Sequence, residues 1–327
     1  MAFRDVVGHR RLVGLLSRAV QRESLPPSLI FAGPAGIGKR LVAIATAQAL
    51  NCRAGGCGAC SICTRIARGV HPDVLIVEPG ENGSIKIDQV REIIDRAAYR
   101  PFEGSRRAVI VDDADRLMPG AQNALLKTLE EPPPSSVFML VTSRPDMLLD
   151  TVRSRCPRLR FRPLDAEDVA AVLMLRGRSE SEARAVAATA DGSIGRALDA
   201  SARELVEARE IAGRVLAHAA ASEDPRRRLE GSKDLLSKTG SGGAGDRDQL
   251  AVHLRVMASF VRDVELLSTS TENRVLVNPD VRPVIERLSA YRGERGIRAF
   301  TAIDQGLAAL ERNASVKVVA DWVMLQL

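Results

Sequence analysis

The chain has 327 residues, and its 47 Lys and Arg against 41 Asp and Glu give a net charge of +6. Its 45% of hydrophobic residues can form sizeable cores, and the length predicts two or three domains of roughly 100–200 residues each. Only ten residues are aromatic, which argues against a single-strand nucleic-acid binder that stacks bases on rows of exposed rings. The N-terminus lacks the apolar segment of a signal peptide, and the fairly apolar stretch 41–50 is too short to span a bilayer. We therefore expect a cytoplasmic protein without membrane contact.

Short apolar runs alternate with helical patterns in the first half of the chain. Strands are predicted at 29–32, 74–77, 108–111 and 138–141, with a fifth at 159–161. Helices are predicted at 40–50, 88–98 and 121–130, and three prolines end the last of these. Because alternating strands and helices form a parallel sheet with helices on both faces, this half is expected to be an α/β domain.

Helical patterns alone continue after residue 163. Short helices are predicted at 166–176, 180–190 and 193–200, and a long helical segment follows. A Gly/Ser-rich run at 239–245 interrupts that segment and is predicted to be a flexible loop. Further helices are expected at 281–288, 298–310 and 315–325, so the second half is predicted to be all-α.

A glycine-rich segment follows the first strand and opens a helix. Gly33-Pro-Ala-Gly-Ile-Gly-Lys39 fits the G-x-x-x-x-G-K pattern of a phosphate-binding loop. Gly33, Gly36 and Gly38 allow backbone N–H groups to face phosphate oxygens, and Lys39 reaches the outer phosphates. ATP or ADP is therefore the expected ligand, and a glycine-rich turn without a ligand is the alternative.

Two sequence features near this loop differ from those of an active phosphate-loop ATPase. The motif places a Ser or Thr hydroxyl after the lysine to bind Mg²⁺, but the chain has Arg40, which offers no lone pair and adds a positive charge. Asp112 follows the third strand, where an acid holds the Mg²⁺ shell, and Asp113 is one methylene shorter than the glutamate that usually polarises the attacking water. We expect weak or absent Mg²⁺-assisted hydrolysis. An acidic strand-end turn is the alternative role for both aspartates.

Four of the five cysteines form a compact cluster in the sequence. Cys52, Cys57, Cys60 and Cys63 have the spacing C-x₄-C-x₂-C-x₂-C, which can close a tetrahedral Zn²⁺ site. Four protein ligands leave no open position, so the expected role of the metal is structural. The alternatives are an iron–sulfur cluster, for which the continuation C-x₃-C-P is absent, and free thiols.

The tripeptide Ser154-Arg155-Cys156, which follows the fourth strand, is a motif specific enough to indicate a protein family. The chain resembles clamp-loader subunits of bacterial DNA polymerase III, members of the AAA+ ATPase superfamily, over essentially its whole length. Besides that tripeptide, the phosphate loop and the cysteine cluster, the resemblance rests on Val6-Val7-Gly8-His9, His71-Pro72-Asp73, the segment 125–132 (Leu-Leu-Lys-Thr-Leu-Glu-Glu-Pro), Gly195-Arg196-Ala197 and the terminal segment 313–327.

The resemblance implies a domain plan and roles for further residues. It implies an AAA+ nucleotide-binding domain at 1–163 with the zinc module at 52–63, a helical lid at 164–205 and a helical collar domain at 206–327. Arg155 would act in trans on ATP held by a neighbouring subunit, a contribution of about 10³–10⁵ in rate, and a solvated surface arginine is the alternative.

Two more positions acquire candidate roles from the same resemblance. Thr142, with Ser143, matches a position that senses the γ-phosphate, and ordinary strand-end capping is the alternative. Arg196 matches a lid arginine that contacts nucleotide in active subunits, and a helix-surface arginine is the alternative.

The function implied by the resemblance is that of one subunit of a DNA polymerase holoenzyme, without a polymerase site of its own, that helps to load the sliding clamp onto primed DNA. Arg40 and Asp113 favour a stationary, ATPase-deficient subunit between a motor subunit and the clamp-opening subunit. Its contact with the clamp would be indirect or transient, and primed DNA would be reached through the complex. The alternatives are a working motor ATPase and a zinc-containing nucleic-acid module.

Overall fold

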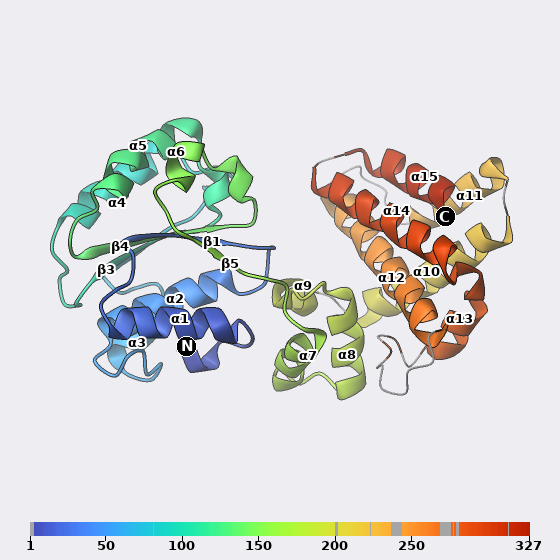
Figure 1. Cartoon of the computed structure of the whole chain (residues 1–327), viewed down its shortest axis with the longest axis horizontal. Helices are drawn as coiled ribbons and strands as arrows, with labels where there is room; N and C mark the ends of the chain where they lie inside the picture. The colour runs from blue at the N-terminus through green and yellow to red at the C-terminus, as the bar shows by residue number, and fades with distance from the viewer. Residues whose placement is uncertain are drawn as a thin grey trace. The chain divides into compact units, whose positions relative to one another are not determined.

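The structure is a computed structural model that describes residues 3–80, 82–199, 202–222, 224–236, 244–268, 276, 278, 281–312 and 314–327. The chain forms two compact units, whose elements are labelled in Figure 1. The first comprises Met1–Asp168 and Ser193–Gly195, and the second comprises Val169–Gly192 and Arg196–Leu327. The separation of the helical part into a lid at 164–205 and a collar at 206–327 stays a prediction.

The first unit is built on a parallel sheet of five strands. In chain order the strands are β1 (Ser28–Ala32), β2 (Val74–Val77), β3 (Arg107–Val111), β4 (Ser136–Thr142) and β5 (Arg158–Arg160). Their order across the sheet is β2-β3-β4-β1-β5, and every neighbouring pair is parallel. All residues of β1, β3 and β4 are buried, which explains why these strands are short unbroken apolar runs. The structure thus confirms the predicted α/β fold.

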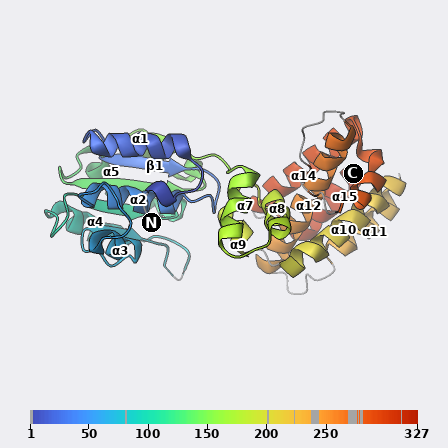
Figure 2. The same cartoon turned by 90° about the horizontal axis from the view of Figure 1, so that it is seen from below.

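Helices cover both faces of the sheet (Figures 1 and 2). One layer contains α1 (Arg10–Gln21), α2 (Lys39–Asn51) and α3 (Ser61–Ala67), and the other contains α4 (Ile87–Ala98), α5 (Pro119–Glu130) and α6 (Asp150–Arg153). Side chains along each strand alternate between two apolar cores, as Ile30 and Phe31 show on β1. Helices α1 and α3 were not predicted, although Leu12 and Leu16 of α1 lie at helical spacing and pack against the sheet.

The second unit is helical throughout its described residues. Helix α7 (Ala166–Leu175) begins in the first unit, and α8 (Glu180–Thr189), α9 (Ile194–Asp199), α10 (Ala202–Ala221), α11 (Pro225–Leu235), α12 (Ala244–Ser268), α13 (Arg282–Arg287), α14 (Glu294–Glu311) and α15 (Val316–Gln326) follow. Helix α12 packs against α10 and α14, and α15 packs against α11 and α14. Most of the predicted loop at 239–245 lies outside the described residues. Within the described part of the chain, no helix combines the length and apolar character needed to cross a membrane.

A buried carboxylate fixes the loop between α4 and β3. Asp73 is fully buried and accepts hydrogen bonds from the backbone N–H groups of Phe102, Glu103 and Gly104 at 2.6, 2.9 and 2.8 Å. The Arg107 guanidinium adds an ion pair at 3.0 Å. Burial by itself raises the pKa of Asp73, but these donors outweigh it and hold the pKa at about 2.

Asp73→Asn should lower the free energy of unfolding of the first unit by about 3 kcal/mol, because it leaves Arg107 buried without its counter-ion. Since the folded pKa is depressed, the charge of Asp73 stabilises the fold above about pH 4, and this stabilisation is lost as the pH falls towards 2. Denaturant unfolding at several pH values measures both effects. The control Asp95→Asn changes an exposed carboxylate and should have little effect; equal losses in the two variants would contradict the role of Asp73.

Candidate nucleotide site and cysteine cluster

The glycine-rich loop connects the end of β1 to the start of α2. Gly36 and Gly38 have φ angles of +73° and +94°, in the left-handed region that favours glycine. A side chain at Gly36 would also collide with Ser193, whose hydroxyl donates to the Ala35 carbonyl at 3.0 Å. The loop therefore has the strand–turn–helix context that a phosphate-binding loop requires.

Lys39 folds back onto the loop that precedes it. The residue is only 6% exposed, and Nζ donates to the carbonyl oxygens of Gly33 and Pro34 at 2.8 and 2.5 Å. Burial lowers the pKa of Lys39, while the carboxylates of Asp113, Asp112 and Asp115 act in the opposite direction. The ammonium group thus lies at the base of the loop and close to the acids that follow β3.

Arg40 pairs with the carboxylate predicted to hold Mg²⁺. Its Nη1 lies 2.9 Å from Oδ2 of Asp112, and its Nη2 forms an ion pair with Glu78. Burial raises the pKa of Asp112, and the positive charge of Arg40 opposes this shift. The Arg40 guanidinium therefore lies between two strand-end acids, one of which, Asp112, is the residue predicted to hold the Mg²⁺ shell.

Glu78 was not among the predicted site residues. It directly follows β2, just as Asp112 directly follows β3, and these two strands are neighbours in the sheet. The sequence could have indicated this residue, because Glu78 is an acid directly after the second predicted strand. The carboxyl ends of parallel strands meet at one edge of the sheet.

The remaining acids after β3 differ in their surroundings. Asp113 is exposed, with its backbone in the left-handed region at φ +45°. Asp115 is buried and accepts a hydrogen bond from the Thr142 hydroxyl at 2.8 Å and from Arg144 at 3.0 Å. The Thr142 oxygen also accepts the N–H of Arg144 at 3.0 Å. The Thr142 hydroxyl thus takes part in strand-end hydrogen bonding, and its role towards phosphate stays a prediction.

Arg155 extends from the turn that follows α6. Its Nη1 donates to the Thr151 carbonyl at 2.9 Å, and its Nη2 lies 3.3 Å from Oε2 of Glu130, in the Leu-Glu-Glu-Pro segment. About a third of its side chain is exposed, at 32%. The guanidinium is therefore partly oriented by its own unit and remains accessible to another molecule.

Arg196 lies in the second unit, at the start of α9. It forms an ion pair with Asp191 at 3.3 Å, and Asp191 also accepts a hydrogen bond from Nε of Arg255 at 2.8 Å. The carboxylate thus links α9 to α12, and nucleotide contact by Arg196 stays a prediction.

The four clustered cysteines bring their sulfur atoms together. All four Sγ atoms lie within 4.8 Å of one another, and Cys52 Sγ is 3.8 Å from both Cys57 Sγ and Cys60 Sγ. Four sulfurs at about 2.3 Å from a tetrahedral ion lie about 3.8 Å apart, so the cluster fits such an ion. Cys156 lies elsewhere, buried in the core beside α5 and α6.

The protein surroundings already favour a thiolate in this cluster. Burial by itself raises the pKa of Cys52, but hydrogen bonds from nearby backbone N–H groups and from Cys63 lower it to about 6. Cys60 also caps the N-terminus of α3 by accepting the N–H of Cys63 at 3.4 Å. The four cysteines can therefore bind a metal ion and join the C-terminus of α2 to α3.

Comparisons with known proteins agree with this geometry. Residues 8–165 match a family described as "DNA polymerase III, delta subunit". The delta' subunit of Pseudomonas aeruginosa is 42% identical over 129 residues, which are 38% of this chain and 39% of the relative. The delta' subunit of Bacillus subtilis is 34% identical over 180 residues, or 54% of each chain. The tau subunit of Bacillus subtilis is 33% identical over 171 residues, or 51% of this chain and 30% of the relative.

The first unit has the fold of a phosphate-loop domain, with a parallel sheet and a glycine-rich loop between β1 and α2. Over residues 8–165, just under half of its length, the chain is similar to the DNA polymerase III family described above. It spans between about a third and about half of the length of these relatives, whose names include both delta' and tau subunits.

The purified chain should carry one metal ion, because the four sulfurs are already arranged for tetrahedral binding. The double variant Cys57→Ser/Cys60→Ser should lose the ion and unfold at a lower temperature, whereas Cys156→Ser should retain it. Native mass spectrometry measures the stoichiometry, and thermal unfolding with and without a chelator measures the stabilisation. A double variant that retained a full equivalent of metal would exclude this cluster as the site.

Proposed function

We propose that this chain is the delta-prime subunit of a bacterial DNA polymerase III clamp loader and helps to load the sliding clamp onto primed DNA. The single observation that carries the ATPase-deficient part of the proposal is the ion pair between Arg40 and Asp112 at 2.9 Å. Mg²⁺ requires free oxygen ligands, and here the strand-end carboxylate is already paired with a guanidinium. The chain would therefore be a stationary member of the assembly that hydrolyses little or no ATP itself.

The proposed contribution of the chain to catalysis is Arg155, donated in trans to ATP held by a gamma/tau motor subunit. The partly exposed guanidinium and its weak anchorage to Glu130 support this role, because the side chain can leave the surface of its own unit at small cost. On its other side the chain would contact the delta subunit. We expect it in the cytoplasm, at the replisome.

We propose Zn²⁺ as the metal of the cysteine cluster, with Cys52, Cys57, Cys60 and Cys63 as ligands. An all-thiolate set suits Zn²⁺, which would hold α2 and α3 together as a structural ion.

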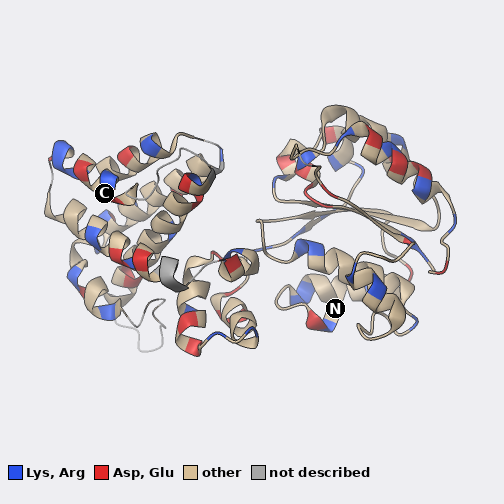
Figure 3. Ribbon diagram, turned by 180° about the vertical axis from the view of Figure 1, so that it is seen from behind, with Lys and Arg blue, Asp and Glu red and all other residues tan. Residues whose placement is uncertain are grey.

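Any contact with the clamp or DNA is proposed to occur within the complete loader. Figure 3 shows basic and acidic residues along helices of both units, whereas α1, α2 and α3 carry basic residues and no acidic ones.

The alternative is an active, gamma/tau-like motor subunit, which the intact loop from Gly33 to Lys39 and the similarity to tau support. The ATP turnover of the purified chain distinguishes the two proposed functions. We expect no Mg²⁺-dependent ATP turnover above that of its Lys39→Ala variant, because Asp112 is bound to Arg40. Clear Mg²⁺-dependent turnover that Lys39→Ala abolishes would establish the motor function instead.

Arg155→Ala should impair the reconstituted loader. ATP hydrolysis at the site that receives this arginine should slow by about 10³-fold or more. Total clamp-stimulated ATP turnover should therefore fall by the fraction that this site normally contributes. The matched control is Arg153→Ala, which removes a nearby arginine paired with Asp146 and Asp150. ATP turnover that was unchanged in Arg155→Ala, or reduced equally in both variants, would overturn the proposal that Arg155 acts in trans on a neighbour's ATP.

A further inference from the structure

Helix α1 carries a row of arginines on its solvent-exposed side. Leu12 and Leu16 pack the inner side of the helix against the core of the first unit. Arg11, Arg18 and Arg22 are exposed. At 3.6 residues per turn, their spacings of seven and four residues keep them within about 40° of one another around the helix axis. These three residues, here called the α1 arginine stripe, extend over about 17 Å along the helix.

No carboxylate neutralises the α1 arginine stripe. Among the described residues, none forms a side-chain hydrogen bond or an ion pair with its three guanidinium groups. Helix α1 contains neither Asp nor Glu. The acids nearest in the sequence, Asp5 and Glu23, lie outside the two ends of the helix, and Asp5 pairs with Arg4 at 3.6 Å. The stripe is therefore a surface of positive charge only.

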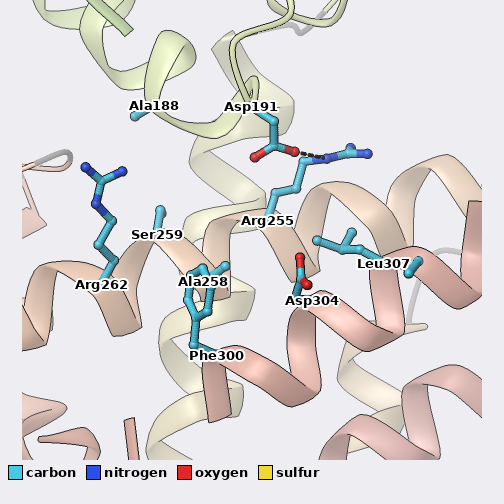
Figure 4. Close-up of a pocket in the computed structure, with 10 residues that line it drawn as sticks. Ala188, Asp191, Arg255, Ala258, Ser259, Arg262, Phe300, Asp304 and Leu307 are labelled. Carbon is cyan, nitrogen blue, oxygen red and sulfur yellow. Dashed lines mark hydrogen bonds and ion pairs between the residues drawn. The ribbon is translucent and has the colours of Figure 1, made fainter. Parts of the chain in front are cut away.

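Arginines on other helices have acidic partners. On α4, Arg96 forms an ion pair with Glu92, one turn earlier in the same helix. Figure 4 shows a second arrangement, on α12, where Asp191 accepts a hydrogen bond from Nε of Arg255 at 2.8 Å. The lack of acids on α1 is thus a local feature and does not simply follow from the high arginine content of the chain.

The positions of these arginines are unfavourable for α1 in water. Arg11 lies with Arg10 in the first turn, where the positive end of the helix dipole favours acidic side chains. Arg18 and Arg22 are four residues apart, so two like charges adjoin across one turn of the helix. An anion that lies along the stripe would remove both penalties.

The middle of the stripe is open to a ligand. Gly14 lies between Arg11 and Arg18 on the same face, three residues after the first and four before the second. A Cβ atom on Gly14 would be 3.6 Å from Nη1 of Arg18, so this guanidinium reaches back over the glycine. A residue without a side chain allows a ligand to come close to the backbone between the two arginines.

We propose that the α1 arginine stripe binds the phosphate backbone of double-stranded DNA. A guanidinium can donate two parallel hydrogen bonds to one phosphate. The duplex carries one negative charge for about every 1.7 Å of its axis, so a stripe of about 17 Å lies along about ten charges. Because α1 contains no aromatic residue, bases are not stacked on it, and the contact does not depend on base sequence.

This contact goes beyond the proposed function, in which DNA is reached through the complete loader. It rests on the charges of α1 alone, so it can be tested on the full chain without the other subunits.

The test measures the binding of the full chain to a short labelled DNA duplex by fluorescence anisotropy, at about 50 to 200 mM salt. The stripe variant Arg11→Ala/Arg18→Ala/Arg22→Ala should bind about tenfold more weakly at the lower salt. The slope of log affinity against log salt should become less steep by about 2.7, or about 0.9 for each lost phosphate contact. Arg18→Ala alone should change the slope by about 0.9. Alanine is a strong helix former, so the variants retain α1, which thermal unfolding verifies.

The matched control removes three exposed arginines from the second unit and changes the net charge by the same amount. This variant, Arg226→Ala/Arg227→Ala/Arg298→Ala, should bind the duplex within about twofold of the unmodified chain. Equal losses in the two triple variants would show that only net charge matters and would overturn the stripe as the site.

Two further results would overturn the proposal. One is the absence of duplex binding by the unmodified chain at the lower salt. The other is binding to phosphatidylglycerol vesicles that exceeds binding to the duplex and is lost in the stripe variant, which would assign the stripe to an anionic membrane surface. The proposed function would stand in each case, because the ATP turnover of the reconstituted loader tests it separately.

Discussion

The parallel direction of the five strands is the constraint on which the rest of the first unit depends. Because every strand runs the same way, the segments that follow β1, β2, β3 and β4 emerge at one edge of the sheet. The glycine-rich loop, Glu78, Asp112 and Thr142 therefore come together although they are far apart in the sequence. A single substitution in the loop can consequently change the electrostatics of the whole edge.

Arg40 has this effect. Its guanidinium pairs with Asp112 and with Glu78, so a permanent positive charge lies among acids that would otherwise attract a divalent cation. In the proposed division of labour, this pair leaves the nucleotide edge as architecture, while Arg155, at a different place on the same unit, would act on a neighbour. The same unit contains the cysteine cluster, which can hold a metal ion, and the buried ion pair of Asp73 with Arg107.

Features encoded locally were predictable from the sequence. The strands appear as short apolar runs because they are buried on both faces, and the cysteine spacing specifies its own cluster within twelve residues. Helices α1 and α3 were not predicted: α3 has only 7 residues, too few for a clear helical period, whereas Leu12 and Leu16 of α1 do have helical spacing. The pairing of Arg40 with Asp112 was also missed, although both residues were singled out. Their contact spans 72 positions and depends on strand order, which residue patterns alone do not specify.

The effect of Mg²⁺ on nucleotide affinity tests most directly whether Arg40 replaces the cation. Binding of a fluorescent ATP analogue to the purified chain should be the same with and without Mg²⁺ within about twofold, whereas Arg40→Thr should bind it about tenfold more tightly when Mg²⁺ is present, a gain of about 1.4 kcal/mol. The gain should disappear in Arg40→Thr/Asp112→Asn, because the released carboxylate is the ligand. Mg²⁺-dependent tightening in the unmodified chain, equal to that in Arg40→Thr, would contradict the replacement of the cation by Arg40.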